Sequence, residues 1–389
     1  MSMHKELVGI AAAVAVAAGT LTAPTAVAAP TGQQARTERQ TRTHDATRKA
    51  MDEVVKSGVT GVVVQVADEH GVWKATAGVG NRETKQPRNA DDRYRAGSIT
   101  KTFIATVLLQ LAAEGRLSLD DTVDKWLPGV VRGNGHDGRK ITVRQLLNHT
   151  SGIFDYSDDL AFQLAIFLPE TFAENRYRTW TPAELMAIAM SHRPSFAPGT
   201  SWSYSNTNYL LAGLVIKKVT GNSYGDEVRA RVIEPLGLHG TYMPGTDPTV
   251  PQPSSRAYSN FFTPTGKIYD VTEMNPSWAN SAGEIISNPG DLNRFYSALL
   301  RGEVLPAKQL AEMKVTFPAP MVEGDYGLGV YVRKLTCGVE VWGHSGGLHG
   351  SNSEAVTTAD GKHSLALNFN DDWGVGSTKI MEAEFCGDS

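Results

Sequence analysis

A serine and a lysine in the stretch RAGSITKTF have the spacing needed to act together. Ser98 and Lys101 are three residues apart, and in a helix this spacing places two side chains on one face, one turn apart. A serine hydroxyl needs a nearby base to become a nucleophile. A partly buried amine can be that base, because desolvation disfavours its charged form. The pair therefore predicts an acylation site at the start of a helix, where backbone N–H groups would face a developing oxyanion.

A second stretch, SYSNTNY, supplies a phenol and a carboxamide at Tyr204 and Asn206, in a turn before a predicted helix. The phenol can carry a proton between a serine and a leaving group, and the amide can hydrogen-bond a substrate carbonyl. Taken alone, the segment is explained better by a helix-capping asparagine beside a core tyrosine. The serine–lysine spacing also recurs at Ser2 and Lys5, so neither stretch is decisive without the other.

A third stretch, WGHSGGLHG over 342–350, admits two interpretations. Residues 343–347 match G-x-S-x-G, the nucleophile turn of α/β-hydrolases, but that turn requires a helix directly after it. The residues that follow alternate as strands do, which favours the second interpretation. In that interpretation a strand edge borders a cleft and holds an extended substrate through its backbone. The Gly347 N–H would then complete an oxyanion hole with the Ser98 N–H.

The elements that position these stretches follow from the spacing of apolar residues. Helices are predicted over 46–56, 98–115, several times between 117 and 238, after 289 and 306, and over 375–385. Strands are predicted around a turn at 69–71 and as an antiparallel meander between 326 and 370. We therefore predict an α+β fold, in which an antiparallel sheet from both chain ends is flanked by helices and carries an inserted all-helical subdomain. The site would lie in the cleft between these two parts.

The chain is predicted to have three parts. Residues 1–29 have the short apolar run and the small residues at its end that are typical of a signal peptide. The alternative is a membrane anchor, but the apolar run is too short to span a bilayer. Residues 30–45 form a polar linker, and 46–389 form one domain, with an α/β part at 46–115 and 270–389 and a helical part at 116–269. We expect a soluble, secreted (extracellular) protein with no membrane span.

Composition excludes some functions. The formal net charge is −4 and no basic run is present, which argues against a nucleic acid partner. The ten histidines show no cluster with metal-ligand spacing, so we expect no metal and no cofactor, and we expect a monomer.

In an exported protein Cys337 and Cys386 are expected to form a disulfide, with two separate buried thiols as the alternative.

Together the three stretches resemble a known family. Ser98-Ile-Thr-Lys101, Tyr204-Ser-Asn206 and His344-Ser-Gly346, in this order and at these separations, are similar to the motifs of the penicillin-recognising serine enzymes. This superfamily of β-lactamases and DD-peptidases also has "ITVRQLLNHTSGIFDY", "WSYSNTNYLLAG", "SWANSAGEIISNPGDL" and "YGLGV" in similar form. The resemblance covers nearly the whole chain after the leader. It is strongest to the class C type and, within it, to the secreted D-alanyl-D-alanine carboxypeptidases, whose disulfide the two cysteines match.

The resemblance implies a β-lactamase/transpeptidase-like fold and assigns roles. Ser98 would be the nucleophile that forms an acyl-enzyme, Lys101 the group that takes its proton, and Tyr204 the proton relay to the leaving group. The substrate-binding residues it implies are Asn206, His344, Ser345, Gly347, Trp278 and Phe162, the last two as walls of the cleft.

The implied function is a serine D-alanyl-D-alanine carboxypeptidase or transpeptidase that acts on D-alanyl or peptidoglycan-like peptides and is acylated by β-lactams. Two residues depart from the pattern of the secreted D-alanyl-D-alanine carboxypeptidases, and both weaken the recognition of a terminal carboxylate. Tyr331 stands where that pattern has an arginine, and Gly347 stands where it has a threonine. Arg333 would share the face of Tyr331 in a strand and could compensate. A class C-like β-lactamase or a D-amino-acid esterase or amidase on the same scaffold is therefore the alternative, and a non-enzymatic β-lactam sensor or wall-binding module is the third hypothesis.

Overall fold

The computed structural model describes residues 43–322 and 324–387. The predicted signal peptide and the predicted linker as far as residue 42 lie outside the described residues. Within the described ranges, none of the helices has the length and apolar character that crossing a bilayer requires.

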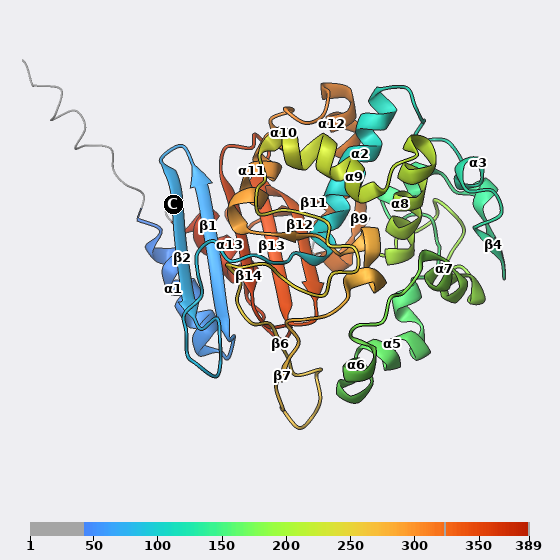
Figure 1. Ribbon diagram of the computed structural model, residues 1–389. Helices are drawn as coiled ribbons and strands as arrows, with labels where there is room; N and C mark the ends of the chain where they lie inside the picture. The colour runs from blue at the N-terminus through green and yellow to red at the C-terminus, as the bar shows by residue number, and fades with distance from the viewer. Residues whose placement is uncertain (1–42, 323, 388–389) are drawn as a thin grey trace, which may run out of the picture. The chain divides into compact units, whose positions relative to one another are not determined.

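The centre of the structure is an antiparallel sheet built from both ends of the described chain, as predicted. Its eight strands run in the order β2-β1-β14-β13-β12-β11-β10-β9. Figure 1 shows the blue strands β1 and β2 beside the red strands of the C-terminal part. The strands are β1 (Gly61–Asp68), β2 (Gly71–Gly78), β9 (Phe317–Ala319), β10 (Gly324–Tyr326), β11 (Tyr331–Lys334), β12 (Glu340–Leu348), β13 (Ser351–Thr358) and β14 (Ser364–Phe369).

Helices cover both faces of this sheet. On one face lie α1 (Asp45–Lys56) and α13 (Ser377–Cys386), and on the other lie α2 (Thr100–Ala113), α11 (Pro289–Leu300) and α12 (Ala307–Met313). The valine-rich run of β1 is buried because apolar side chains from both layers meet it: Val62 and Val64 face α1, whereas Val63 faces the α2 and α11 side. This burial on two faces explains why β1 reads as a continuous apolar run.

Between α2 and Leu238 the chain is mostly helical, as predicted. The helices there are α3 (Val123–Trp126), α4 (Val143–Leu147), α5 (Leu160–Ile166), α6 (Pro169–Asn175), α7 (Pro182–Ser191), α8 (Asn206–Thr220), α9 (Tyr224–Val228) and α10 (Glu234–Leu236). Thr181 caps α7 through a reciprocal capping box with Glu184, and Pro182 occupies its first turn. The chain between α2 and α11 also holds the short strand pairs β4 (Arg132–Gly133) with β5 (His136–Asp137), and β6 (Tyr258–Ser259) with β7 (Tyr269–Asp270).

Strand β12 settles the two interpretations of the WGHSGGLHG stretch. It turns directly into β13 and no helix follows it, so the nucleophile turn of α/β-hydrolases is excluded. The expectation of a strand edge needs correction, because β12 lies inside the sheet. However, β11 pairs with it only as far as Gly343, so the half that carries residues 344–348 has no β11 partner and lies against the turn that carries Ser98.

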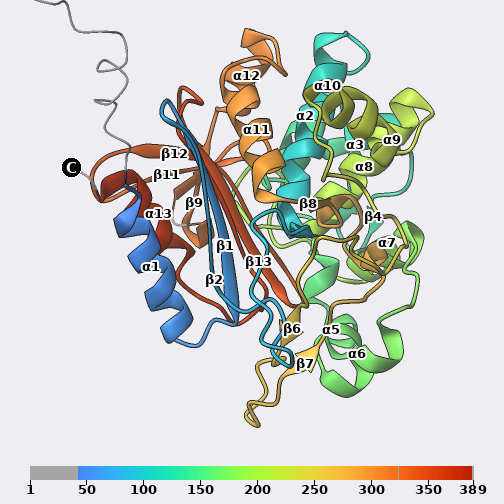
Figure 2. The same ribbon diagram turned by 60° about the vertical axis from the view of Figure 1, so that its left-hand side comes forward.

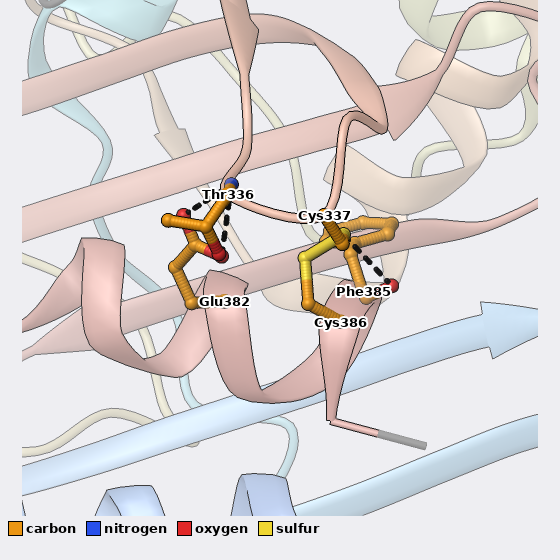
Figure 3. The surroundings of a disulfide bond; sticks show 5 residues. All are labelled: Thr336, Cys337, Glu382, Phe385 and Cys386. Carbon is orange, nitrogen blue, oxygen red and sulfur yellow. Dashed lines mark hydrogen bonds between the residues drawn. A yellow bond between two sulfur atoms is a disulfide. The ribbon is translucent and has the colours of Figure 1, made fainter. Parts of the chain in front are cut away.

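A disulfide joins Cys337 and Cys386, as predicted. It connects the turn before β12 to the last residue of α13, and Figure 3 shows it beside a second contact between the same segments. In that contact the Thr336 backbone N–H and hydroxyl donate to the Glu382 carboxylate at 3.0 and 2.6 Å. The bond therefore anchors the C-terminal helix to the sheet.

Candidate active site

Ser98 lies in a tight turn directly before α2. The turn, η1 (Gly97–Ile99), follows the short strand β3 (Tyr94–Arg95). It begins with a glycine because Gly97 has φ +58°, and because a Cβ at this position would lie 2.8 Å from the Gly347 backbone nitrogen. This close approach places the Ser98 backbone beside residues 344–348 of β12, the half that has no β11 partner.

Lys101 lies one turn further on and is fully buried. Its Nζ lies 3.0 Å from Ser98 Oγ, 2.9 Å from Asn206 Oδ1 and 2.7 Å from the Ala282 carbonyl oxygen. The last two atoms can only accept hydrogen bonds. A neutral amine has two N–H groups and one lone pair, so donation to these two acceptors leaves its lone pair directed at the Ser98 hydroxyl. The geometry therefore suits an amine that takes the serine proton.

The pKa of Lys101 also suits an amine that takes the serine proton. Burial lowers the pKa of Lys101 to about 7, and the charge of Asp155 opposes this shift. A substantial fraction of the amine is then neutral at neutral pH, which an exposed lysine could not achieve.

Tyr204 completes the predicted group of three. It lies directly before α8, and its ring centroid is 4.6 Å from Lys101 Nζ. Burial raises the pKa of Tyr204, and a hydrogen bond with Ser98 opposes that shift. The phenol therefore keeps its proton and can donate it. The structure thus brings Ser98, Lys101 and Tyr204 together at one place.

Asn206 is the first residue of α8 and lies at the same place, with both ends of its carboxamide bonded within the protein. Its Oδ1 accepts from Lys101, and its Nδ2 donates to Asp155 Oδ2 at 3.0 Å and to Ser157 Oγ at 3.1 Å. We predicted that this amide binds substrate. It does border the cavity, but its bonds show that it also orients the lysine.

Asp155 and Ser157 were missed by the sequence reasoning. Both lie in or just after the stretch NHTSGIFDY, which contributes to the family resemblance but does not by itself indicate a role for either residue. The available signal is an aspartate directly after Ile-Phe and before a tyrosine, because a carboxylate among apolar residues needs partners.

The backbone of β12 approaches the turn that carries Ser98 most closely at Gly346 and Gly347. A Cβ added to Gly346 would overlap the Ala96 carbonyl oxygen and would lie 2.9 Å from the Ser98 nitrogen. Only a residue without a side chain permits this approach of strand and turn. The N–H groups of Ser98 and Gly347 are therefore neighbours, as the oxyanion-hole prediction requires.

His344 lies behind the cavity and does not line it. It is buried, its Nδ1 donates to the Ser345 carbonyl oxygen at 2.5 Å, and its Nε2 accepts from the Tyr326 hydroxyl at 2.8 Å. Burial lowers the pKa of His344 to about 3, so the ring is neutral. The ring of His344 therefore lies outside the lining of this cavity, and its contact with substrate stays a prediction. Ser345 instead borders a second cavity of about 360 Å³, which also reaches Gly347.

A cavity of about 460 Å³ opens above Ser98. Trp278, Gly347 and Asn206 line it, as predicted. Phe162 does not: it is on the buried side of α5, where its ring packs against Tyr156 and Trp180 with centroids 5.4 and 5.0 Å away. The aromatic walls also include Tyr156, Phe167, Phe261 and Phe262. Spacing alone could not tell Phe162 from Phe167, because both belong to the same short helical segment.

Among the described residues that line this cavity, none is a lysine or an arginine. Tyr331 is buried and hydrogen-bonds Glu354. Arg333 shares its face, as predicted, but its Nη1 lies 3.6 Å from Glu354 Oε2 and its Nε donates to the Val322 carbonyl oxygen. Arg333 does not border the cavity.

Comparison with known proteins agrees with this geometry. The family model described as Beta-lactamase matches residues 31–378. Penicillin-binding protein 4* of Bacillus subtilis is 26% identical over 294 residues, which cover 72% of this chain and 61% of that protein. The chain spans about three fifths or less of the length of the first curated relatives it matches.

Two solved structures are similar over almost their whole length. A D-stereospecific amidohydrolase from Streptomyces sp. is 57% identical with a TM-score of 0.84, and the match covers 89% of this chain and 99% of that one. D-amino acid amidase from Ochrobactrum anthropi SV3, complexed with D-phenylalanine, is 28% identical with a TM-score of 0.76, again over 89% and 99%.

Proposed function

Because the chain belongs to the beta-lactamase family, whose members include serine hydrolases, we propose that it hydrolyses amides and esters of D-amino acids through an acyl-enzyme on Ser98. The 57% identity to a D-stereospecific amidohydrolase over nearly its whole length supports this choice within the family. The similarity to a D-amino acid amidase supports it further.

The observation that carries the proposal is the character of the cavity above Ser98. One side of it is aromatic, the Asp372 carboxylate also lines it, and no lysine or arginine lines it among the described residues. A site that receives the terminal carboxylate of a D-alanyl-D-alanine peptide needs a cation or a set of donors for it. This cavity suits a bulky apolar side chain instead, because burial of that side chain supplies the binding energy.

The acylation step follows from the contacts of Ser98. As its oxygen attacks the substrate carbonyl carbon, its proton passes to the Lys101 amine, and the N–H groups of Ser98 and Gly347 stabilise the oxyanion. When the C–N or C–O bond breaks, the leaving group takes a proton from the Lys101 ammonium by way of the Tyr204 hydroxyl. The products are an ester on Ser98 and a free amine or alcohol.

Deacylation reverses the proton flow. A water molecule loses its proton towards Tyr204 and Lys101 as it attacks the ester carbonyl, and the Ser98 oxygen regains a proton when the acid leaves. The neutral amine that the geometry favours is the starting state of both halves of the reaction.

The test compares four substrates with the purified protein: D-phenylalanine amide, its L enantiomer, D-alanine amide and a D-alanyl-D-alanine peptide. We expect D-phenylalanine amide to have the highest kcat/KM, and the L enantiomer to be at least about 100-fold slower, a ratio that a well-shaped site achieves. Equal rates for the two enantiomers, or release of D-alanine from the peptide as the fastest reaction, would contradict the proposal.

A second candidate function is a D-alanyl-D-alanine carboxypeptidase or transpeptidase on peptidoglycan-like peptides. The three ordered motifs and the penicillin-binding relatives favour it. In either case β-lactams are expected to acylate Ser98, so acylation by a fluorescent penicillin alone does not separate the two functions. Release of D-alanine does.

We also propose that the protein acts outside the cell, and the monomeric state expected from the sequence stays a prediction. Its disulfide supports export, because such bonds persist in oxidising compartments. The mass of the purified protein in solution and fractionation of the producing cells test these two points.

A further inference from the structure

A buried carboxylate stands behind the acylation site and touches neither Ser98 nor Lys101 directly. Asp155 is 6% exposed and is the N-terminal cap of the short turn Tyr156–Asp158. Its Oδ2 accepts from the Asn206 backbone N–H at 2.9 Å and from Asn206 Nδ2 at 3.0 Å, and its Oδ1 accepts from the Ser157 N–H at 3.0 Å. Burial raises the pKa of Asp155, and the hydrogen bonds from Asn206 and Ser157 oppose that shift because all three partners are donors that stabilise the ionised carboxylate.

These bonds fix which way the Asn206 carboxamide points. Its NH₂ group is held by Asp155 and by the Ser157 hydroxyl, so its oxygen must face Lys101. With the opposite orientation, an N–H donor would face the lysine, and the amine would lose one of its two obligate acceptors. The Asp155 carboxylate thus determines the hydrogen-bonding pattern around Nζ through one intermediate side chain.

The other titratable groups around Lys101 carry no charge of their own near neutral pH. They are Tyr204 and Tyr209 from the α8 segment, His149 from the loop after α4, and His344 from β12. Burial raises the pKa of both tyrosines and lowers the pKa of both histidines, so all four are neutral. Asp155 is therefore the charged group that acts on the amine among them, and its charge raises the pKa of Lys101.

We propose that Asp155 is a positioning residue of the acylation site: it locks the Asn206 carboxamide with its oxygen toward Lys101, and its negative charge sets the proton affinity of that amine. This inference rests on the proposed role of Lys101 as the base for Ser98, and it does not depend on which acyl group is the natural substrate.

The test is a pH profile of kcat/KM with an uncharged 4-nitrophenyl ester whose hydrolysis is lost in Ser98→Ala. In the wild type the profile rises with pH as Lys101 loses its proton, with a midpoint near its pKa of about 7. Asp155→Asn removes the charge and keeps the shape. The amine then holds its proton less tightly, so the midpoint should fall by about one pH unit, the lower end of what one nearby charge does.

A matched control is Asp158→Asn, which removes an exposed carboxylate three residues away in the same turn. It should leave the midpoint within about 0.2 pH units of the wild type, because an exposed charge is screened. A midpoint that moves equally in both variants, or in neither, would overturn the proposed charge effect of Asp155.

A double-mutant cycle tests the positioning step. Asp155→Ala should lower kcat/KM about 10- to 100-fold in the wild type and by less than about threefold when Asn206→Ala is already present, because both changes then act through one contact. Full additivity would overturn the positioning role.

Thermal unfolding of each variant identifies loss of fold, and Asp155→Asn keeps the test valid if Asp155→Ala does not fold. If the wild type shows no Ser98-dependent ester hydrolysis, the proposed function fails first and this inference with it.

Discussion

The two ends of the cavity above Ser98 are built differently. At the polar end, Ser98 and Asn206 line the cavity, and Lys101 and Tyr204 hydrogen-bond Ser98. These residues come from the turn before α2, from α2 and from the start of α8, and α2 and α8 are packed in the core. At the aromatic end, Phe167, Phe261 and Phe262 come from the end of α5 and from the loop between β6 and β7. Phe167 and Phe262 are 42% and 74% exposed, whereas Lys101 is fully buried. The core thus holds the chemistry, and surface segments hold the groups that select the substrate.

This contrast has an energetic meaning. A buried amine is stable only when acceptors surround it, so the polar end tolerates few changes. An exposed ring costs little to replace in the free protein and matters only when a substrate covers it. Substitutions at the polar end should therefore change the rate constant, whereas substitutions at the aromatic end should change selectivity.

Removal of the nucleophile should give the largest effect. Ser98→Ala should lower kcat/KM at least about 10⁴-fold, because the acyl-enzyme cannot form and only binding and the oxyanion site remain. The measurement is hydrolysis of a D-phenylalanyl ester, with the melting temperature as the control for folding. Residual turnover within tenfold of the wild type would show that the polar end does not act through Ser98.

Removal of the base should come next. Lys101→Met, which keeps the length and removes the amine, should lower kcat about 10²- to 10⁴-fold, the usual range for a general base. Since the amine must be neutral, the wild-type rate should rise with pH around the Lys101 pKa of about 7, and the remaining activity of the variant should lose that rise. A variant with an unchanged pH profile would show that another group takes the proton.

The aromatic end should show a smaller and selective effect. Phe262→Ser should raise KM for D-phenylalanine amide about threefold to tenfold, the loss expected for part of one buried ring, with kcat nearly unchanged. D-alanine amide is the internal control, because its methyl group does not reach the ring, and its KM should not change. An equal rise in KM for both substrates would mean that Phe262 supports the polar end of the cavity and does not contact the side chain of the substrate.

The smallest effect on activity should come from a region remote from both ends. Replacement of Cys337 and Cys386 by serine should leave kcat and KM unchanged, because the bond joins the turn before β12 to the end of α13. It should lower the free energy of unfolding by about 4 kcal/mol, the loop-entropy value for a separation of 49 residues. Denaturant titration measures this. A loss of activity without a loss of stability would place the disulfide in the site.

The sequence predicted the polar end better than the aromatic end, for a physical reason. Ser98, Lys101 and Tyr204 lie at the starts of helices with strong apolar spacing, and their chemical roles restrict which residue types can stand there. The antiparallel sheet was predictable because its strands alternate or form short apolar runs between turn residues.

The sequence is a weaker guide where three-dimensional contacts decide. Phe162 and Phe167 are indistinguishable by spacing, and only packing against Trp180 shows which is buried. The burial of the His344 ring and its bond to Tyr326 also depend on contacts that spacing does not reveal. Asp155 went unassigned because its partner, Asn206, is 51 residues away in the chain.

The central claim is that Ser98 carries the acyl group during turnover, and trapping that intermediate tests it most directly. The protein would be mixed with N-acetyl-D-phenylalanine 4-nitrophenyl ester, quenched with acid within the first turnovers, digested and analysed by mass spectrometry. The account predicts an N-acetylphenylalanyl adduct on the peptide that contains Ser98, absent in Ser98→Ala. Steady turnover with no adduct on that peptide, or with the adduct on another residue, would contradict it.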